Sequence, residues 1–315
     1  MRRFRGLTGI CTILLLLACV SSALAQAPIS LKYKFVPNQV LNYATTMRGT
    51  ASIAAQGAPM MVGDTNIKGS LDLRQRILGI RPDGAATVQL SCPRMAFNIT
   101  LPGQTMALLW QNQKFTVTLN GQSTSAPSKE LAALPLFGKP LRMVMSPYGK
   151  VLDMPDLTQL QGMMGNVDFS QMMKLGQNQL PDRPVMVGET WSTSTNVPVP
   201  GSSQSLITNA TYTLAGIETV GSQQAARINF ITSSSGSGIS ITAPNTNQSV
   251  SIDQLTENSQ GSMLFGLQSG KLLRSYITSR IHQQMSGPTA PAGSGASGPT
   301  QISIDMNFTA NTSLK

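Results

Sequence analysis

The sequence predicts a mainly β protein, with curved antiparallel sheets in two related halves and a short Met-rich helical insert between them. Three observations lead to this prediction. Apolar and polar residues alternate through most of the chain, which is typical of strands with one buried face. Glycine-containing turn motifs recur in the same order on both sides of one segment. That segment has helical spacing of its apolar residues and holds paired methionines.

Alternation with a period of two residues defines the expected strands. Its clearest cases are residues 29–35, 71–77, 88–92, 115–119 and 302–308. Because neighbouring side chains of a strand point to opposite faces, each of these segments has an apolar side and a polar side. The pair Asn120-Gly121 directly follows one of them and is typical of a tight hairpin turn. One-sided strands joined by such turns indicate antiparallel pairing.

Residues 153–178 form the predicted helical insert. Asp153 can cap a helix, and Pro155 fits the first turn. Apolar residues then follow at helical spacing, at Leu157, Leu160, Met164 and Val167. The insert carries the methionine pairs Met163-Met164 and Met172-Met173. Thioether side chains pack adaptably against varied apolar ligands, so these four methionines are the candidate ligand-binding residues.

The insert separates a first β half, residues 26–152, from a second β half, residues 179–315. Both halves contain G-I-x-x-x-G between two strands, at 79–84 and at 216–221. A second match, Gly-Lys at 149–150 and at 270–271, follows later in each half. Recurrence in the same order predicts a degenerate duplication.

Three segments of low complexity are predicted as loops. They are residues 54–64, the serine- and glycine-rich stretch 233–238, and a flexible loop at 286–300 rich in Gly, Pro, Ala and Ser. A strand pattern resumes after the last of them, so all three are expected to be surface connections within the β architecture rather than linkers between domains.

The first 25 residues are predicted to be a secretory signal peptide. A basic start with Arg2, Arg3 and Arg5 precedes a short apolar run, and Ala23-Leu-Ala25 closes the segment. Cleavage between Ala25 and Gln26 would leave a periplasmic or secreted protein with no transmembrane span. Leu16-Leu-Ala-Cys19 also resembles a bacterial lipobox. Lipidation of Cys19 is therefore the alternative, and it would anchor the chain to the envelope.

Charge and cysteine content narrow the function classes. The formal net charge is +10, but Lys and Arg are spread along the chain without interleaved aromatic residues, which argues against nucleic-acid binding. Two of the three cysteines, Cys11 and Cys19, lie in the signal segment. Cys92 then remains alone, so we expect no intramolecular disulfide. Its alternation with Val88 and Leu90 predicts a buried, unreactive thiol, and Pro93 after it predicts a strand end or bulge.

The sequence holds few groups that carry catalysis. His282 is the only histidine, which excludes every site built from several histidines, and its strand position predicts a solvent-facing side chain. No nucleotide-binding, calcium-binding or nucleophile-elbow motif occurs. We expect no cofactor, no metal and no catalytic residue. A hydrolase would need two carboxylates that converge in a cleft, which the sequence leaves open.

Three segments resemble the motifs of a family of exported, uncharacterised β-rich bacterial proteins. They are L-x-Y-K-F at 31–35 with the strand–turn–strand that follows to Tyr43, S-P-x-G-x-V-L at 146–152, and L-P-x-x-P-V-x-V-G-x-x-W at 180–191. Asn38 stands where many members have glycine, and asparagine also tolerates positive φ. The resemblance implies the same compartment and architecture, and the family has no assigned activity to carry over.

The sequence therefore predicts a non-catalytic extracytoplasmic envelope protein that binds an apolar ligand or lipid in a hollow between sheet and helix. The alternative is a structural or protein-interaction module with a solid core. Methionines that line a cavity favour the first hypothesis, whereas a filled interior favours the second.

Overall fold

The computed structural model describes residues 27–55, 63–125, 139–154, 179–198, 204–242, 249–289 and 299–315. Every regular element in these ranges is a β-strand. They hold no helix of the length and apolarity that crossing a membrane requires. The predicted insert lies outside the described residues apart from Asp153, which ends a strand, and Met154.

A single antiparallel sheet of 14 strands forms the described part of the molecule. The strands are β1 (Val40–Ala55), β2 (Gly63–Ile80), β3 (Ala86–Leu101), β4 (Gln104–Gln111), β5 (Lys114–Leu119), β6 (Gln122–Ser125), β7 (Leu141–Met145), β8 (Val151–Asp153), β9 (Thr190–Pro198), β10 (Ser205–Val220), β11 (Gln223–Thr242), β12 (Ser249–Gly266), β13 (Lys271–Thr289) and β14 (Pro299–Leu314). Their order is β6-β5-β4-β3-β2-β1-β14-β13-β12-β11-β10-β9, with β7 paired to β3 and to β8.

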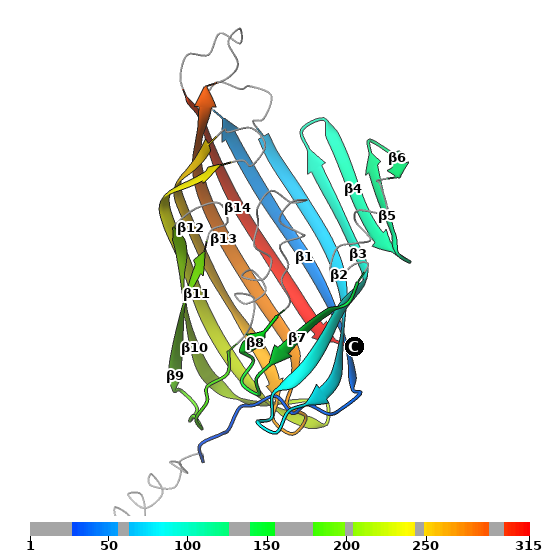
Figure 1. Cartoon of the computed structure of the whole chain (residues 1–315), viewed down its shortest axis with the longest axis vertical. Helices are drawn as coiled ribbons and strands as arrows, with labels where there is room; N and C mark the ends of the chain where they lie inside the picture. Colours follow the sequence, from blue (N-terminus) through cyan, green and yellow to red (C-terminus); the bar gives the residue numbers. More distant parts are fainter. Residues whose placement is uncertain are drawn as a thin grey trace, which may run out of the picture.

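The sheet curves into an open trough (Figure 1). Its outer strands in the described chain, β6 and β9, do not pair with each other. The antiparallel β prediction is confirmed, but the expected separate sheets are one sheet. The reason is β14, which pairs with β13 on one side and with β1 on the other, from Tyr43↔Leu314 to Ala55↔Ile302.

Alternation assigns each residue to the concave or the convex face. On β14, Ile304, Met306 and Phe308 are half-buried, whereas Asp305 and Asn307 are exposed. The same rhythm holds on β11, where Ile228 is fully buried and Ile231 is 64% exposed. The apolar set is the one that packs against the rest of the core, so it defines the concave face.

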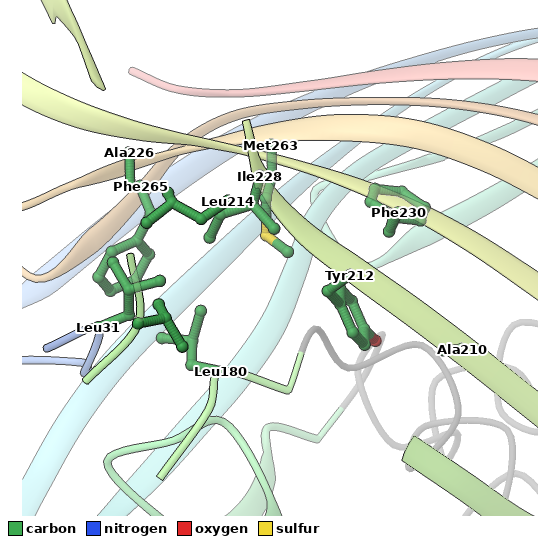
Figure 2. Packing of buried hydrophobic residues seen from close by; sticks show 11 residues of the cluster. Leu31, Leu180, Ala210, Tyr212, Leu214, Ala226, Ile228, Phe230, Met263 and Phe265 are labelled. Atoms are coloured by element: carbon green, nitrogen blue, oxygen red, sulfur yellow. The ribbon is translucent and has the colours of Figure 1, made fainter. Parts of the chain in front are cut away.

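One end of the trough is covered, and we call it the capped end. The extended residues 27–39 and 179–189 lie there together with β7 and β8 (Figure 1). Leu31 and Leu180 pack against buried side chains of β10–β12, among them Leu214, Ile228 and Met263 (Figure 2). A second buried cluster joins β2, β3, β7 and β8 through Ile77, Ala86, Val88, Met143, Met145 and Val151.

Two segments differ from the sequence prediction. Residues 29–35 alternate in burial as expected, but Ile29 bridges only Val185, so the segment is an extended strap and not a strand of the sheet. Residues 233–238 are not a loop, because they run through β11. Residues 233–237 pair with β12, and residues 233–235 pair with β10 as well. This backbone pairing replaces the missing hydrophobic pattern.

The flanks of the predicted loop at 286–300 are also strand. Gly287 pairs with Thr300 and Thr289 with Pro299, which extends the β13–β14 hairpin. Proline is tolerated as the first residue of a strand, so the composition of this segment does not prevent pairing.

Two entry turns, Val36–Gln39 and Met186–Glu189, precede β1 and β9. Asn38 has φ 63° and Gly188 has φ 90°, both left-handed values. The amide of Asn38 donates to the carbonyl of Ile77 at 2.9 Å, and the amide of Gly188 donates to the carbonyl of Leu214 at 2.7 Å. The amide of Ile77 in turn donates to the carbonyl of Gln39, and the amide of Leu214 donates to the carbonyl of Glu189. The two turns therefore hold equivalent buried residues of β2 and β10.

The hairpins that follow are irregular at matching places. The register shifts between Ile77 and Gly79 on β2, and between Leu214 and Gly216 on β10. It shifts again beside the β7–β8 turn and beside the β12–β13 turn, where Gly149 and Gly270 have φ 84° and 59°. Each glycine match seen in the sequence thus lies in a hairpin with a bulge next to it.

Truncation of one concave-face residue should destabilise the fold strongly. Ile228→Ala removes a fully buried side chain, and we expect a loss of about 2–5 kcal/mol in the free energy of unfolding. Ile231→Ala, on the convex face of the same strand, should change it by less than about 0.5 kcal/mol. Urea unfolding monitored by circular dichroism measures both. Equal losses would contradict the assignment of faces.

Candidate functional site: the concave face

An apolar surface extends along the concave face beyond the capped end. It is formed by inward-facing residues of β1, β2, β13 and β14: Met47, Ala51, Ile53, Ile67, Leu71, Ile277, Ile281, Ile304, Met306 and Phe308. We call this set the inner apolar surface. Ala51 is buried and the other members are half-buried, so they keep part of their area exposed. Half-buried aliphatic side chains arranged in rows can bind apolar ligands.

Polar side chains interrupt the concave face on β12 and β13. The hydroxyls of Ser259 and Ser279 lie 2.9 Å apart and are buried, with 4% and 0% exposure. Their oxygens lie 3.1 and 3.3 Å from Oε1 of Glu257, so two hydroxyl protons are shared among three oxygens. Beside them, Ser234 of β11 is hydrogen-bonded to Thr208 of β10 at 2.9 Å. We call Glu257, Ser259 and Ser279 the polar triangle.

The two faces differ in charge. Glu257 is the one charged residue that faces the concave side among the described positions of β1, β2 and β9–β14. Seven bases of the same strands lie on the convex face: Arg48, Lys68, Arg74, Arg76, Arg227, Arg274 and Arg280. Glu218, an acid of the convex face, is paired with Arg227. The carboxylate of Glu257 forms none of the ion pairs within the described chain.

The predicted ligand-binding methionines Met163, Met164, Met172 and Met173 lie outside the described residues, as do Cys19, Ala25 and Gln26. Other methionines do face the concave side, including Met47, Met263 and Met306. Met306 already belonged to a predicted alternating strand. Glu257 was missed, although its spacing of two from Leu255 and Ser259 was a signal for the same face.

His282 lies on the convex face, as its strand position predicted. Its Nδ1 is 2.7 Å from Oδ1 of Asp305 on β14. The cross-strand neighbour of Asp305 on β1 is Ser52, and the Ser52 hydroxyl donates to Asp64. This geometry does not connect a serine nucleophile to His282. Within the described residues no group of three or more His, Cys, Asp or Glu side chains could hold a metal ion.

Cys92 is buried, with 3% exposure, and lies in a bulge of β3 opposite β2, as Pro93 predicted. Its carbonyl accepts a 2.8 Å hydrogen bond from Nε1 of buried Trp110, and its thiol donates to the carbonyl of Arg94 at 3.3 Å. Burial raises the pKa of the Cys92 thiol to about 11. Because the thiolate is the nucleophile, this thiol is unreactive at neutral pH.

Two hollows lie at opposite ends of the sheet. One of about 420 Å³ lies at the capped end between the β7–β8 turn and β9, and Tyr148, Leu180 and Trp191 line it. Trp191 is fixed there, because its ring stacks on Tyr212 at 5.5 Å and its Nε1 donates to the carbonyl of Gln179. The other hollow, of about 510 Å³, lies at the opposite end of β10–β12, and convex-face residues such as Ile207, Ser235 and Thr256 form most of its lining.

No protein-family model and no curated protein matches the chain. Among solved structures, a lipovitellin structure that concerns lipid–protein interactions is similar at 10% identity and a TM-score of 0.38. The match covers 90% of this chain and 25% of the lipovitellin chain, so the chain spans about a quarter of that protein. OpdL of Pseudomonas aeruginosa is similar at 7% identity and a TM-score of 0.20, over 88% of this chain and 99% of its own. OccK11 (OpdR) of the same species is similar at 10% identity and a TM-score of 0.17, over 90% and 99%. Likenesses this distant carry no argument about function.

The raised pKa of Cys92 predicts slow thiol labelling and a stability that falls in alkaline solution. At about pH 8, Ellman's reagent should react at least roughly tenfold more slowly with the folded than with the unfolded protein. The folded-state pKa is raised from 9.0 to about 11, so the unfolded thiol ionises first and unfolding becomes easier as the pH rises through this window. A Cys92→Ala variant serves as the control, because the part of this pH dependence that comes from Cys92 should be missing. Fast native labelling would contradict the burial.

Proposed function

We propose that the protein binds an apolar ligand or lipid on the concave face of its sheet, as a non-catalytic component of the bacterial envelope. The observation that carries the proposal is the inner apolar surface. In the described chain, the extended residues 27–39 and 179–189, together with β7 and β8, cover the capped end, while the inner apolar surface beyond it stays half-exposed. Contiguous apolar area of this kind on a folded protein favours a binding role.

Burial of an alkyl chain on this surface provides enough free energy for measurable binding. Each buried methylene group contributes about 0.8 kcal/mol, so a chain of about ten carbons gains roughly 8 kcal/mol before the entropy of association is subtracted. A net free energy of about half that value corresponds to a millimolar dissociation constant, and the full value to a micromolar one. The inner apolar surface spans four adjacent strands, and several partly exposed side chains contribute from each.

None of the described residues has a catalytic role in the proposed function. Cys92 is buried with a raised pKa, and His282 lies on the convex face beside Asp305. The carboxylate of Glu257 accepts hydrogen bonds from two serine hydroxyls and is not hydrogen-bonded to a second acid. A hydrolytic site would need convergent carboxylates, which this geometry does not favour.

The proposed compartment rests on the sequence, and the proposed duplication rests on both the sequence and the fold. The segment 1–25 supports export and cleavage before Gln26, with lipidation of Cys19 as the alternative destination. A duplication that produced two related β halves is supported by the matched entry turns and the matched bulges. In this view each half supplies one part of the trough.

A charge placed on the inner apolar surface should abolish apolar binding. Met306→Glu introduces a carboxylate among half-buried aliphatic residues, and we expect at least a roughly tenfold loss of affinity for an uncharged environment-sensitive fluorophore. Asn307→Glu places the same side chain on the convex face of the same strand and should change the affinity by less than about twofold. Fluorescence titration measures both, with circular dichroism as the check on folding.

A Met306→Glu protein that stays folded and binds the fluorophore like the unmodified protein would place the binding site elsewhere. Failure of the unmodified protein to bind any uncharged apolar probe would contradict the proposed function as a whole.

A further inference from the structure

We propose that the polar triangle receives the ammonium head of an amphiphile whose alkyl tail lies across the inner apolar surface. The inference rests on the proposed function and names the chemical class of its ligand. The ligand is a cationic amphiphile with hydrogen-bond donors on its head, and fatty acids of equal chain length are selected against.

The polar triangle is placed between two apolar regions. Toward the capped end, Gly261 and Met263 follow Ser259 on the same face of β12, beside Phe230 of β11. Toward the other end lies the cluster of Ile239 and Ile252, packed with Leu255. Together with Ser234 of β11 and Thr208 of β10, the polar triangle therefore forms a polar site between two apolar regions of the concave face. Polar groups in such a setting cost free energy unless they are hydrogen-bonded, so a ligand head that completes their bonding is favoured.

The carboxylate of Glu257 has acceptor capacity left over. An ionised carboxylate offers about four acceptor positions on two oxygens. Both serine hydroxyls lie within reach of the same oxygen, Oε1, and the described residues provide no ion pair to either oxygen. An ammonium group has three donors and a positive charge, so it can fill the remaining positions and neutralise the carboxylate.

The same charges exclude an anionic head. The described concave positions of β1, β2 and β9–β14 offer no lysine or arginine to a fatty-acid carboxylate or a phosphate. An anionic head on this face would meet Glu257 without a compensating base, and like charges repel. The bases of these strands lie on the convex face, separated from the site by the sheet itself.

The register fixes a path for the tail. Glu257 on β12 pairs with Ile281 on β13, Ile281 with Met306 on β14, and Met306 with Ala51 on β1. Neighbouring strands lie about 4.8 Å apart, so these three steps span roughly 14 Å, comparable to an extended decyl chain. Phe308, the cross-strand partner of Ser279, lies one row nearer the capped end on the same face and borders this path.

Displacement of a bound uncharged fluorophore tests the inference with two probes of equal length. Decylammonium and decanoate are both fully ionised at about pH 7 and are compared below their micelle-forming concentrations. In the unmodified protein, decylammonium should displace the fluorophore at a concentration at least roughly tenfold lower than decanoate. In Glu257→Gln, which keeps the shape of the side chain and removes its charge, this ratio should fall below about threefold, with each displacement referred to the fluorophore affinity measured for the same variant.

The matched control is Glu218→Gln, the same substitution on the convex face, which should keep the full preference for decylammonium. Absence of fluorophore binding in the unmodified protein would overturn the proposed function. Normal fluorophore binding without a preference for decylammonium, or a preference that survives in Glu257→Gln, would overturn this inference and leave the proposed function standing.

Discussion

The ladder between β1 and β14 is the constraint on which the rest of the structure depends. It joins Tyr43 to Leu314 and continues to Ala55 and Ile302, so the last strand of the described chain pairs with β1, the first strand of the described sheet. Without it the two groups of strands on either side would be separate sheets. With it they form one surface on which inward-facing side chains of β12, β13, β14, β1 and β2 are continuous. The inner apolar surface exists because this pairing keeps the register of both groups in phase.

The continuous sheet also separates apolar side chains on its concave face from charged side chains on its convex face. Because the side-chain period is two, each pairing that places Met306 and Phe308 on the concave side places Asp305 and Asn307 on the other. The charged residues of the strands are thereby collected on the convex face, with Glu257 as the exception on the described concave face. The carboxylate of Glu257 is hydrogen-bonded to two buried serines, and its remaining acceptor positions are the basis of the proposed head-group site.

Local features of the fold could be predicted from the sequence because they depend on neighbouring residues. Asn120 and Gly121 have φ 49° and 82° in a hairpin turn, Asn38 has φ 63°, and Cys92 is buried beside a bulge, all as expected. The union of the sheets could not be predicted, since it depends on pairing between residues more than 240 positions apart. The strand through 233–238 was missed because serine and glycine carry no hydrophobic period, and its extended form depends on pairing with β12 and, up to Ser235, with β10.

The central claim, that the concave face carries an apolar ligand, is tested most directly by mass spectrometry on protein purified from its own host. Native and denaturing spectra of one sample give the mass of the chain with and without any bound molecule. The account predicts an additional mass that is released on denaturation and that belongs to an amphiphile with an alkyl tail and an amine head. Protein that is repeatedly free of releasable mass, and that also takes up no apolar probe, would contradict the account and favour an interaction module with a solid core.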